Sequence, residues 1–405
     1  MRLSLCIICL ALAPSAMSAD LTPTPTPPRN LHDAMELAWR VSPQAQALEA
    51  RRSEVMVRRE AAAALLPSAP AASASYRSDQ LTRNAGQREF DAELGLPLWL
   101  PQEQATRLGL VDAEQAELDA AAAALRLAIA GELRDALWAA ALAENEMQLA
   151  RERLQAAAAL EKDVARRVDA GYLATTDLLV AQGETLAARG ALLDREAQLA
   201  QARRSYALLS GGAELPEAGV EAPREPPAQE SHPALLAART AIALATARVR
   251  VAAKARRENP ELALFARNER AGAADPYSTS VGVKVRVPLA GAAYSQPAVA
   301  AAQTELAQAE AEYRLLQQSL AAGVNRAQQD MDYALQHVEL AQKQQTNGAE
   351  NLKLVQKAFD LGERDLPSLM RARAAAQQAD LALAQKKIAL ARARADLNQA
   401  QGILP

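Results

Sequence analysis

The chain is poor in the residues that build compact globular cores and many enzyme sites. Of its 405 residues, 3% are aromatic, two are cysteine and three are histidine. Both cysteines, Cys6 and Cys9, lie within the first 18 residues. A chain that has lost this segment would carry no thiol, disulfide or cysteine-based metal site. Alanine, leucine, glutamine, glutamate and arginine dominate instead, which is typical of long helices packed through small side chains.

Two further absences narrow the function. The formal net charge is −3, and no block of lysine and arginine is dense enough to follow a phosphate backbone, so nucleic acid is not predicted as a partner. Beyond the N-terminal segment no run of about 18 uncharged apolar residues occurs, so the sequence predicts no transmembrane helix.

Residues 1–18 are predicted to form a signal peptide. Arg2 supplies a positive charge, residues 3–13 are apolar, and residues 16–18 place small side chains at the cleavage positions. The alternative is a buried N-terminal helix. Residues 19–30 form a proline-rich leader for which no secondary structure is expected.

The rest of the chain repeats itself. Gly362 follows Gly171 by 191 residues, and two leucine-rich ladders with a seven-residue spacing share this offset. Solenoid repeats have periods of roughly 20–50 residues, so this longer period indicates a duplicated domain half. The predicted organisation is a first repeat at 31–212, a proline-rich linker at 213–233 and a second repeat at 234–405.

Each repeat is predicted to contain a helix, two strands, a long helix, a tight turn and a final helix. Residues 102–170 hold no proline and, as one helix, would extend roughly 100 Å. A second long helix is expected from about Pro297 to Leu361. Helices of this length need neighbours along their whole length, and seven-residue spacing indicates supercoiled packing. The predicted fold is therefore mainly α with a small β part.

Strict alternation of polar and apolar residues predicts strands at about 70–78, 90–100, 260–269 and 278–288, the third on a weaker pattern. Such strands carry polar side chains on one face and apolar side chains on the other. The charged candidates for the polar face are Asp91, Glu93, Lys284 and Arg286. The candidates for the apolar face are Leu94, Leu96, Leu98, Val281, Val283, Val285 and Val287.

Four strands cannot close into a membrane barrel, since these start at eight strands, and an open edge in lipid leaves backbone groups unpaired. Two chains would supply eight strands, and three chains would supply twelve strands and begin to open a lumen. We expect the polar faces to line this lumen and the apolar faces to contact lipid. The alternative is a soluble sheet with one buried face.

The tight turns are expected to close two helical hairpins. Gly171 and Gly362 can adopt the left-handed conformation that ends a helix, Thr175 or Thr176 can cap the next helix in the first repeat, and Asp365 can do so in the second. These ends are expected to be the least packed part of a helical barrel. They are therefore predicted to form a gate and a docking surface, with exposed side chains such as Leu173, Thr176 and Leu366.

The duplicated layout, together with Ala170-Gly171 followed by Thr176-Asp177-Leu178-Leu179, resembles the TolC family of outer membrane efflux proteins. The resemblance implies a homotrimer with a twelve-stranded β-barrel and a trimeric α-helical barrel that crosses the periplasm. It also implies two partners, a periplasmic adaptor (membrane fusion protein) and an inner-membrane RND-type pump. Residues 232–235 are similar to the CzcC-like heavy-metal branch, so metal cations join drugs and secreted proteins as candidate cargo.

One departure from the family concerns the tip. Members often carry acidic residues six and nine positions after the second tip glycine, where this chain has Ser368 and Arg371. Asp177 occupies the six-residue position in the first repeat, and Asp365 lies closer to the second tip glycine. The resemblance therefore does not extend to an acidic ring.

No motif predicts an enzyme, a cofactor or a metal site. His32, His232 and His337 have no second ligand at helical spacing, and no phosphate loop or nucleophile motif occurs. The predicted function is a passive outer membrane conduit for substrates delivered by a pump. The alternatives are a periplasmic coiled-coil adaptor, which would have one helical hairpin flanked by β domains, and a scaffold without a pore.

Overall fold

The computed structural model describes residues 30–212, 214–216, 221, 224, 227–255, 257–289 and 292–405. The predicted signal peptide, nearly all of the leader and much of the linker lie outside these ranges. Among the described residues, no helix is both long enough and apolar enough to cross a membrane.

The first repeat follows the predicted order. Its helices are α1 (Leu31–Val41), α2 (Pro43–Ala63), α3 (Glu103–Asp169) and α4 (Thr175–Leu209), and its strands are β1 (Ala71–Ser78) and β2 (Arg88–Pro97). The Asn30 side chain caps α1 by accepting the Asp33 N–H at 2.8 Å. Ser42 and Pro43 separate α1 from α2, because the proline ring fits the first turn of a helix but not its interior.

The second repeat has nearly the same dimensions. After the short 3₁₀ turn η1 (Gln229–Ser231) come α5 (Pro233–Lys254), β3 (Glu261–Arg270), β4 (Ser278–Arg286), α6 (Ala292–Asp360) and α7 (Leu366–Ala400). The long helices α3 and α6 contain 67 and 69 residues, and α4 and α7 contain 35 each. This agreement between the halves supports the duplication deduced from the 191-residue offset.

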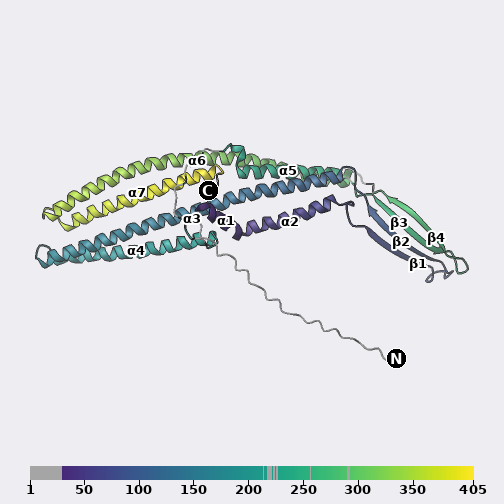
Figure 1. Cartoon of the computed structure of the whole chain (residues 1–405), viewed down its shortest axis with the longest axis horizontal. Coiled ribbons are helices and arrows are strands. Elements are labelled where there is room, and N and C mark those ends of the chain that lie inside the picture. The colour runs from purple at the N-terminus through teal and green to yellow at the C-terminus, as the bar shows by residue number, and fades with distance from the viewer. Residues whose placement is uncertain are drawn as a thin grey trace, which may run out of the picture.

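Figure 1 shows how the two repeats lie side by side in an elongated, gently curved molecule. Each long helix runs from the sheet to a distant tip, where the chain turns and the shorter helix returns to mid-length. Helix α2 packs on the sheet-proximal part of α3, and α5 packs on α6 and α3. The sheet extends beyond the helices at the other end of the molecule.

The core is divided into small clusters along the helices instead of one central core. The cluster at mid-length joins Met35 of α1, Leu133 and Leu137 of α3 and Tyr206 of α4. Here the buried guanidinium of Arg134 forms two 2.8 Å hydrogen bonds to the Glu221 carboxylate and a third bond, at 3.1 Å, to the Ile403 carbonyl oxygen. Both the linker and the C-terminal segment are thereby held against α3.

Several predicted boundaries were wrong by a few residues. Helix α6 begins at Ala292, five residues before Pro297, so this proline lies inside the helix, beyond its first turn. Strand β2 runs over residues 88–97 instead of 90–100, and β4 ends at Arg286. Leu98 and Val287, assigned to the apolar strand face, therefore lie just beyond the strand ends.

Candidate channel surfaces: the sheet and the helical tips

The four strands form one antiparallel sheet in the order β1-β2-β3-β4, and their register keeps apolar residues together. The row Ala72, Leu94, Leu264 and Val283 crosses all four strands. Val281, Val283 and Val285 of this face are 81%, 63% and 64% exposed. In the described chain, the extensive contacts of the sheet are all between its own strands. In a soluble sheet with one buried face, the apolar face would be covered. Here the apolar face is exposed, so the structure does not match that alternative.

The opposite face carries the charged residues predicted for it, and they form ion pairs between strands. Lys284 Nζ donates to both carboxylate oxygens of Glu93 at 3.0 and 3.1 Å, reaching over Ala263, which is buried. Arg267 Nε donates to Asp91 at 2.8 Å and lies 3.2 Å from Glu89. These pairs make the face hydrophilic while they cancel most of its charge.

Arg286, the fourth predicted residue of this face, is exposed and lies opposite Glu261 in the strand register. On the apolar face, Leu96 lies opposite Leu262 and is half-buried. Both outer strands have one unpaired edge within the described residues, since β1 pairs only with β2 and β4 only with β3. Such edges are templates for pairing with another strand.

The two helical turns at the far end have the same geometry. Gly171 and Gly362 adopt φ values of 79° and 77°, in the left-handed region that favours glycine. The N–H of Tyr172 donates to Arg167 O at 2.8 Å, and the N–H of Glu363 donates to Ala358 O at 2.9 Å. These bonds satisfy the last carbonyls of α3 and α6 in the same way, which confirms the predicted helix stops.

The helix starts after the turns are capped differently. The Asp365 side chain accepts the Ser368 N–H at 3.2 Å, as predicted. The pKa of that carboxyl is lowered, first by a hydrogen bond with the Ser368 side chain and to a smaller extent by this backbone bond. In the first repeat neither Thr175 nor Thr176 is the cap: Thr175 already lies in α4. The capping residue is Ala174, whose N–H donates to the carboxylate of Asp177 at 3.2 Å.

The prediction that Leu366 is exposed at the tip was wrong. Leu366 is 2% exposed and belongs to an apolar cluster from both hairpins, whose members are Leu160, Val164, Ala181, Phe359, Leu366 and Leu369. We call this set the tip cluster. Leu173 is half-buried against it, and Thr176 is exposed. Ser368 is half-buried, whereas Arg371 is exposed and donates to the Ser368 hydroxyl at 3.2 Å.

Two arginines that the sequence reading missed connect the hairpins beside the tip cluster. Arg167 of α3 donates to Asp360 of α6 at 2.8 Å, and its guanidinium lies 4.8 Å from the centre of the Phe359 ring. Arg373 of α7 donates to Ala156 O of α3 at 3.3 Å, and burial lowers the pKa of Arg373. Their partners are distant in sequence, so local periodicity could not reveal them.

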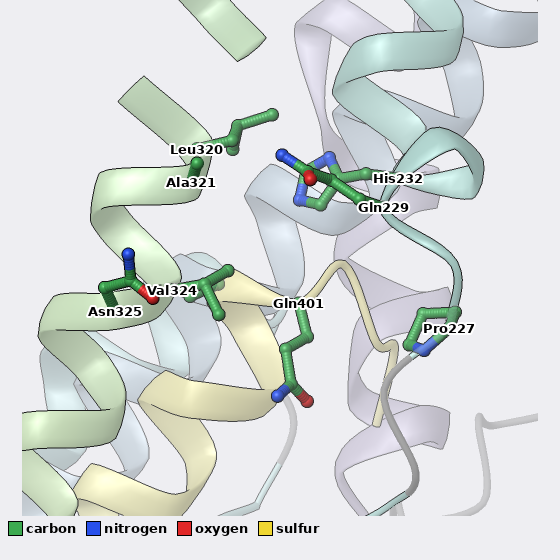
Figure 2. A pocket seen from close by; sticks show the side chains of 9 residues that line it. Pro227, Gln229, His232, Leu320, Ala321, Val324, Asn325 and Gln401 are labelled. Atoms are coloured by element: carbon green, nitrogen blue, oxygen red, sulfur yellow. The ribbon is translucent and has the colours of Figure 1, made fainter. Parts of the chain in front are cut away.

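A cavity of about 220 Å³ lies at mid-length, where His232 starts α5. Figure 2 shows His232 and Gln229 facing Leu320 and Val324 of α6 across it. His232 Nδ1 accepts the Ala234 N–H at 3.1 Å, and burial lowers the pKa of the imidazole, which favours the neutral form. No cluster of three or more metal-ligating side chains occurs within the described ranges. The histidine thus acts as a helix cap.

Comparison with known proteins agrees with this geometry. Residues 226–403 match the sequence model of the outer membrane efflux protein family. Among solved structures, CusC aligns with a TM-score of 0.76 and 17% identity over 92% of both chains. VceC from Vibrio cholerae gives 0.73 and 16% over 92% of this chain and 96% of its own. The Campylobacter jejuni CmeC outer membrane channel gives 0.73 and 13%, over 96% and 90%. No curated protein sequence matches the chain.

The second half of the chain therefore carries an outer membrane efflux protein domain, and the fold of nearly the whole chain is that of solved outer membrane channels. The duplicated hairpins and the four-stranded sheet described above agree with that fold.

Proposed function

We propose that the chain is the outer membrane component of a tripartite efflux system and acts as a passive conduit from the periplasm to the exterior. In this proposal the sheet lies in the outer membrane of a Gram-negative bacterium, and the helices extend into the periplasm. The chain binds its cargo weakly and performs no chemistry on it.

The observation that carries the proposal is the exposed apolar face of the sheet opposite a face of ion pairs. Burying apolar side chains in lipid removes them from water, and a polar inner face suits a water-filled lumen. The sheet also has two open edges, which lipid does not tolerate because nothing there replaces the missing hydrogen bonds.

In a trimer, both unpaired strand edges of each sheet can pair with neighbouring chains. If β4 of each chain pairs with β1 of the next, twelve strands close, enough to open a lumen. The long helices would form a helical barrel below. The family resemblance points to the same homotrimer, and the charges Asp91, Glu93, Lys284 and Arg286 would line its β-barrel.

The tips are the proposed gate and docking surface. Thr176 and Tyr172 are exposed there, with 82% of Tyr172 accessible, so they are available to a periplasmic adaptor that links the channel to an inner-membrane RND-type pump. The buried tip cluster and the Arg167–Asp360 bridge would hold each chain's hairpins together in the closed arrangement. The chain itself is a poor candidate for the adaptor, since the part that the structure describes has two hairpins and a single four-stranded sheet.

The proposed cargo is whatever the pump delivers. Residues 232–235 suggested heavy-metal cations, but His232 is occupied as a helix cap and no described cluster ligates a metal. The paired charges on the polar face favour neither sign of ion. Metal cations therefore remain a hypothesis about what the pump delivers, alongside drugs and secreted proteins.

The test combines location, assembly and activity. The full chain should fractionate with outer membranes, run as a trimer in mild detergent and restore efflux-dependent resistance to a strain that lacks its own channel. A signal-free chain that is a monodisperse soluble monomer would contradict the proposal. Trimers in the outer membrane without any restored efflux would favour the scaffold alternative.

A further inference from the structure

Two glycines occupy equivalent places on the polar face of the sheet. Gly95 lies in β2 and Gly282 in β4, 187 residues later, and both flank β3. Neither has a positive φ, so the backbone does not require glycine at these positions. Glycine inside a strand weakens it and often marks a place where another group approaches closely. The approaching groups here are two side chains of β3.

Phe265 of β3 covers Gly282. The two residues are opposite each other in the register, and a β-carbon at position 282 would lie 2.6 Å from Cζ and 2.8 Å from Cε1 of the ring. The ring therefore lies along the sheet toward β4 instead of pointing straight away from it. Phe265 is an aromatic residue on a face that otherwise carries mainly charged residues, serine, alanine and glycine, and it lies directly opposite Glu93 on its other side.

Gly95 is covered in a different way. A β-carbon there would meet the carboxylate of Glu261, with Oε1 at 1.8 Å. This oxygen is the far end of a flexible side chain, which can rotate away from an added methyl group. The phenylalanine ring is rigid and can move only as a whole. The ion pairs Lys284–Glu93 and Arg267–Asp91 lie beside it on the same face, so the free direction is away from the sheet.

We propose that Gly282 is a recess in the lumen wall that holds the ring of Phe265 to one side and thereby sets the width of the pore. This inference rests on the proposed channel, in which the polar face lines the lumen. In a trimer the three rings lie at one height. If all three were displaced from their recesses, they would form an aromatic constriction at that level.

The experiment measures single-channel conductance of purified trimers in planar lipid bilayers. Gly282→Ala adds one methyl group, too small to narrow the lumen by itself, so a loss of conductance would report the displaced ring. The matched control Gly95→Ala adds the same methyl group in β2 and should leave conductance unchanged. Phe265→Ala should not lower conductance, and Phe265→Ala combined with Gly282→Ala should restore the wild-type value.

The outcomes separate the inference from the function on which it rests. Since closed tips would block conduction, each trimer is also measured with Arg167→Ala, which removes the bridge proposed to hold the tips closed. Trimers that fail to conduct even with this change would contradict the channel itself. If trimers conduct and adding Gly282→Ala leaves the conductance unchanged, the recess does not set the width and the inference is wrong. If Gly282→Ala does not assemble, the double variant should recover assembly, since removing the ring removes the clash; failure to recover it would also overturn the inference.

Discussion

Adjacent positions on β1 offer a sharp test of which face of the sheet meets lipid. Ala72 lies in the apolar row with Leu94, whereas the neighbouring Ser73 lies on the polar face opposite Glu93. Arginine at position 72 would project into lipid. The same arginine at position 73 would enter the lumen beside a carboxylate. Ala72→Arg and Ser73→Arg thus introduce one identical side chain into one strand and differ only in the face.

The expected difference is large. An arginine on the lipid face of a membrane barrel costs about 2–4 kcal/mol near the midplane and about 0–1 kcal/mol near the interfaces. The row of Ala72 includes Val283, the sixth of nine residues of β4, so it lies away from the hairpin ends. A cost of about 2–4 kcal/mol corresponds to a change of roughly 30- to 1,000-fold in the folding equilibrium constant of each chain. Ser73→Arg should stay near wild type.

The measurement is a urea titration of trimers refolded in phospholipid vesicles, with the yield of heat-resistant trimer on gels as a second readout. Ala72→Arg should lower the unfolding free energy and the trimer yield, and Ser73→Arg should lower neither. Equal loss in both variants would show that the two faces do not meet different solvents. Greater loss in Ser73→Arg would mean that the faces are assigned the wrong way round.

Three further predictions concern the helices. Arg134→Ala removes the charged partner of the Glu221 carboxylate, which keeps only the hydrogen bond from the Asn398 side chain. Breaking a buried ion pair in this way should remove about 3–5 kcal/mol from the unfolding free energy, seen in thermal unfolding by circular dichroism; unchanged melting would contradict this. Burial lowers the pKa of His232 in the folded chain. As the pH falls below about 6.5, the unfolded chain therefore takes up the proton first and the free energy of unfolding decreases. His232→Asn, which keeps a side chain able to cap α5, should make the free energy of unfolding depend less on pH between pH 8 and 5. Valine at both Gly171 and Gly362 penalises the left-handed turns by about 1–2 kcal/mol each and should reduce efflux-dependent resistance at equal trimer level, whereas full resistance would mean that the tips are only structural.

The sequence predicted those features that depend on local pattern. The 191-residue offset revealed the duplication, alternation placed Val281, Val283 and Val285 on one face, and Gly171 and Gly362 marked the helix ends. The alternation and the glycines lie within a few residues of the elements that they define, and the offset compares two such local patterns. The structure adds the strand register and shows that the apolar face stays uncovered.

The features that the sequence did not reveal depend on long-range contacts or on small differences at element ends. Leu366 was expected to be exposed, but four helices converge on it, and no local spacing records that convergence. Arg167 meets Asp360 across 193 residues of chain. The cap at Ala174 was missed because an alanine side chain cannot accept a hydrogen bond and so is not recognised as a capping residue. The hydrogen bond is instead donated by the Ala174 N–H to the carboxylate of Asp177, three residues later.

The surroundings of Arg134 also impose an order on folding. This cation belongs to the first third of the chain, yet it is enclosed by Glu221 and by Gln399 and the Ile403 carbonyl near the C-terminal end. Contacts with such wide sequence separation form late, since a long loop must close first. A chain that emerges N-terminus first cannot complete the middle of its first repeat until its last residues arrive. Until then the Arg134 guanidinium and the apolar surface around it stay open to water.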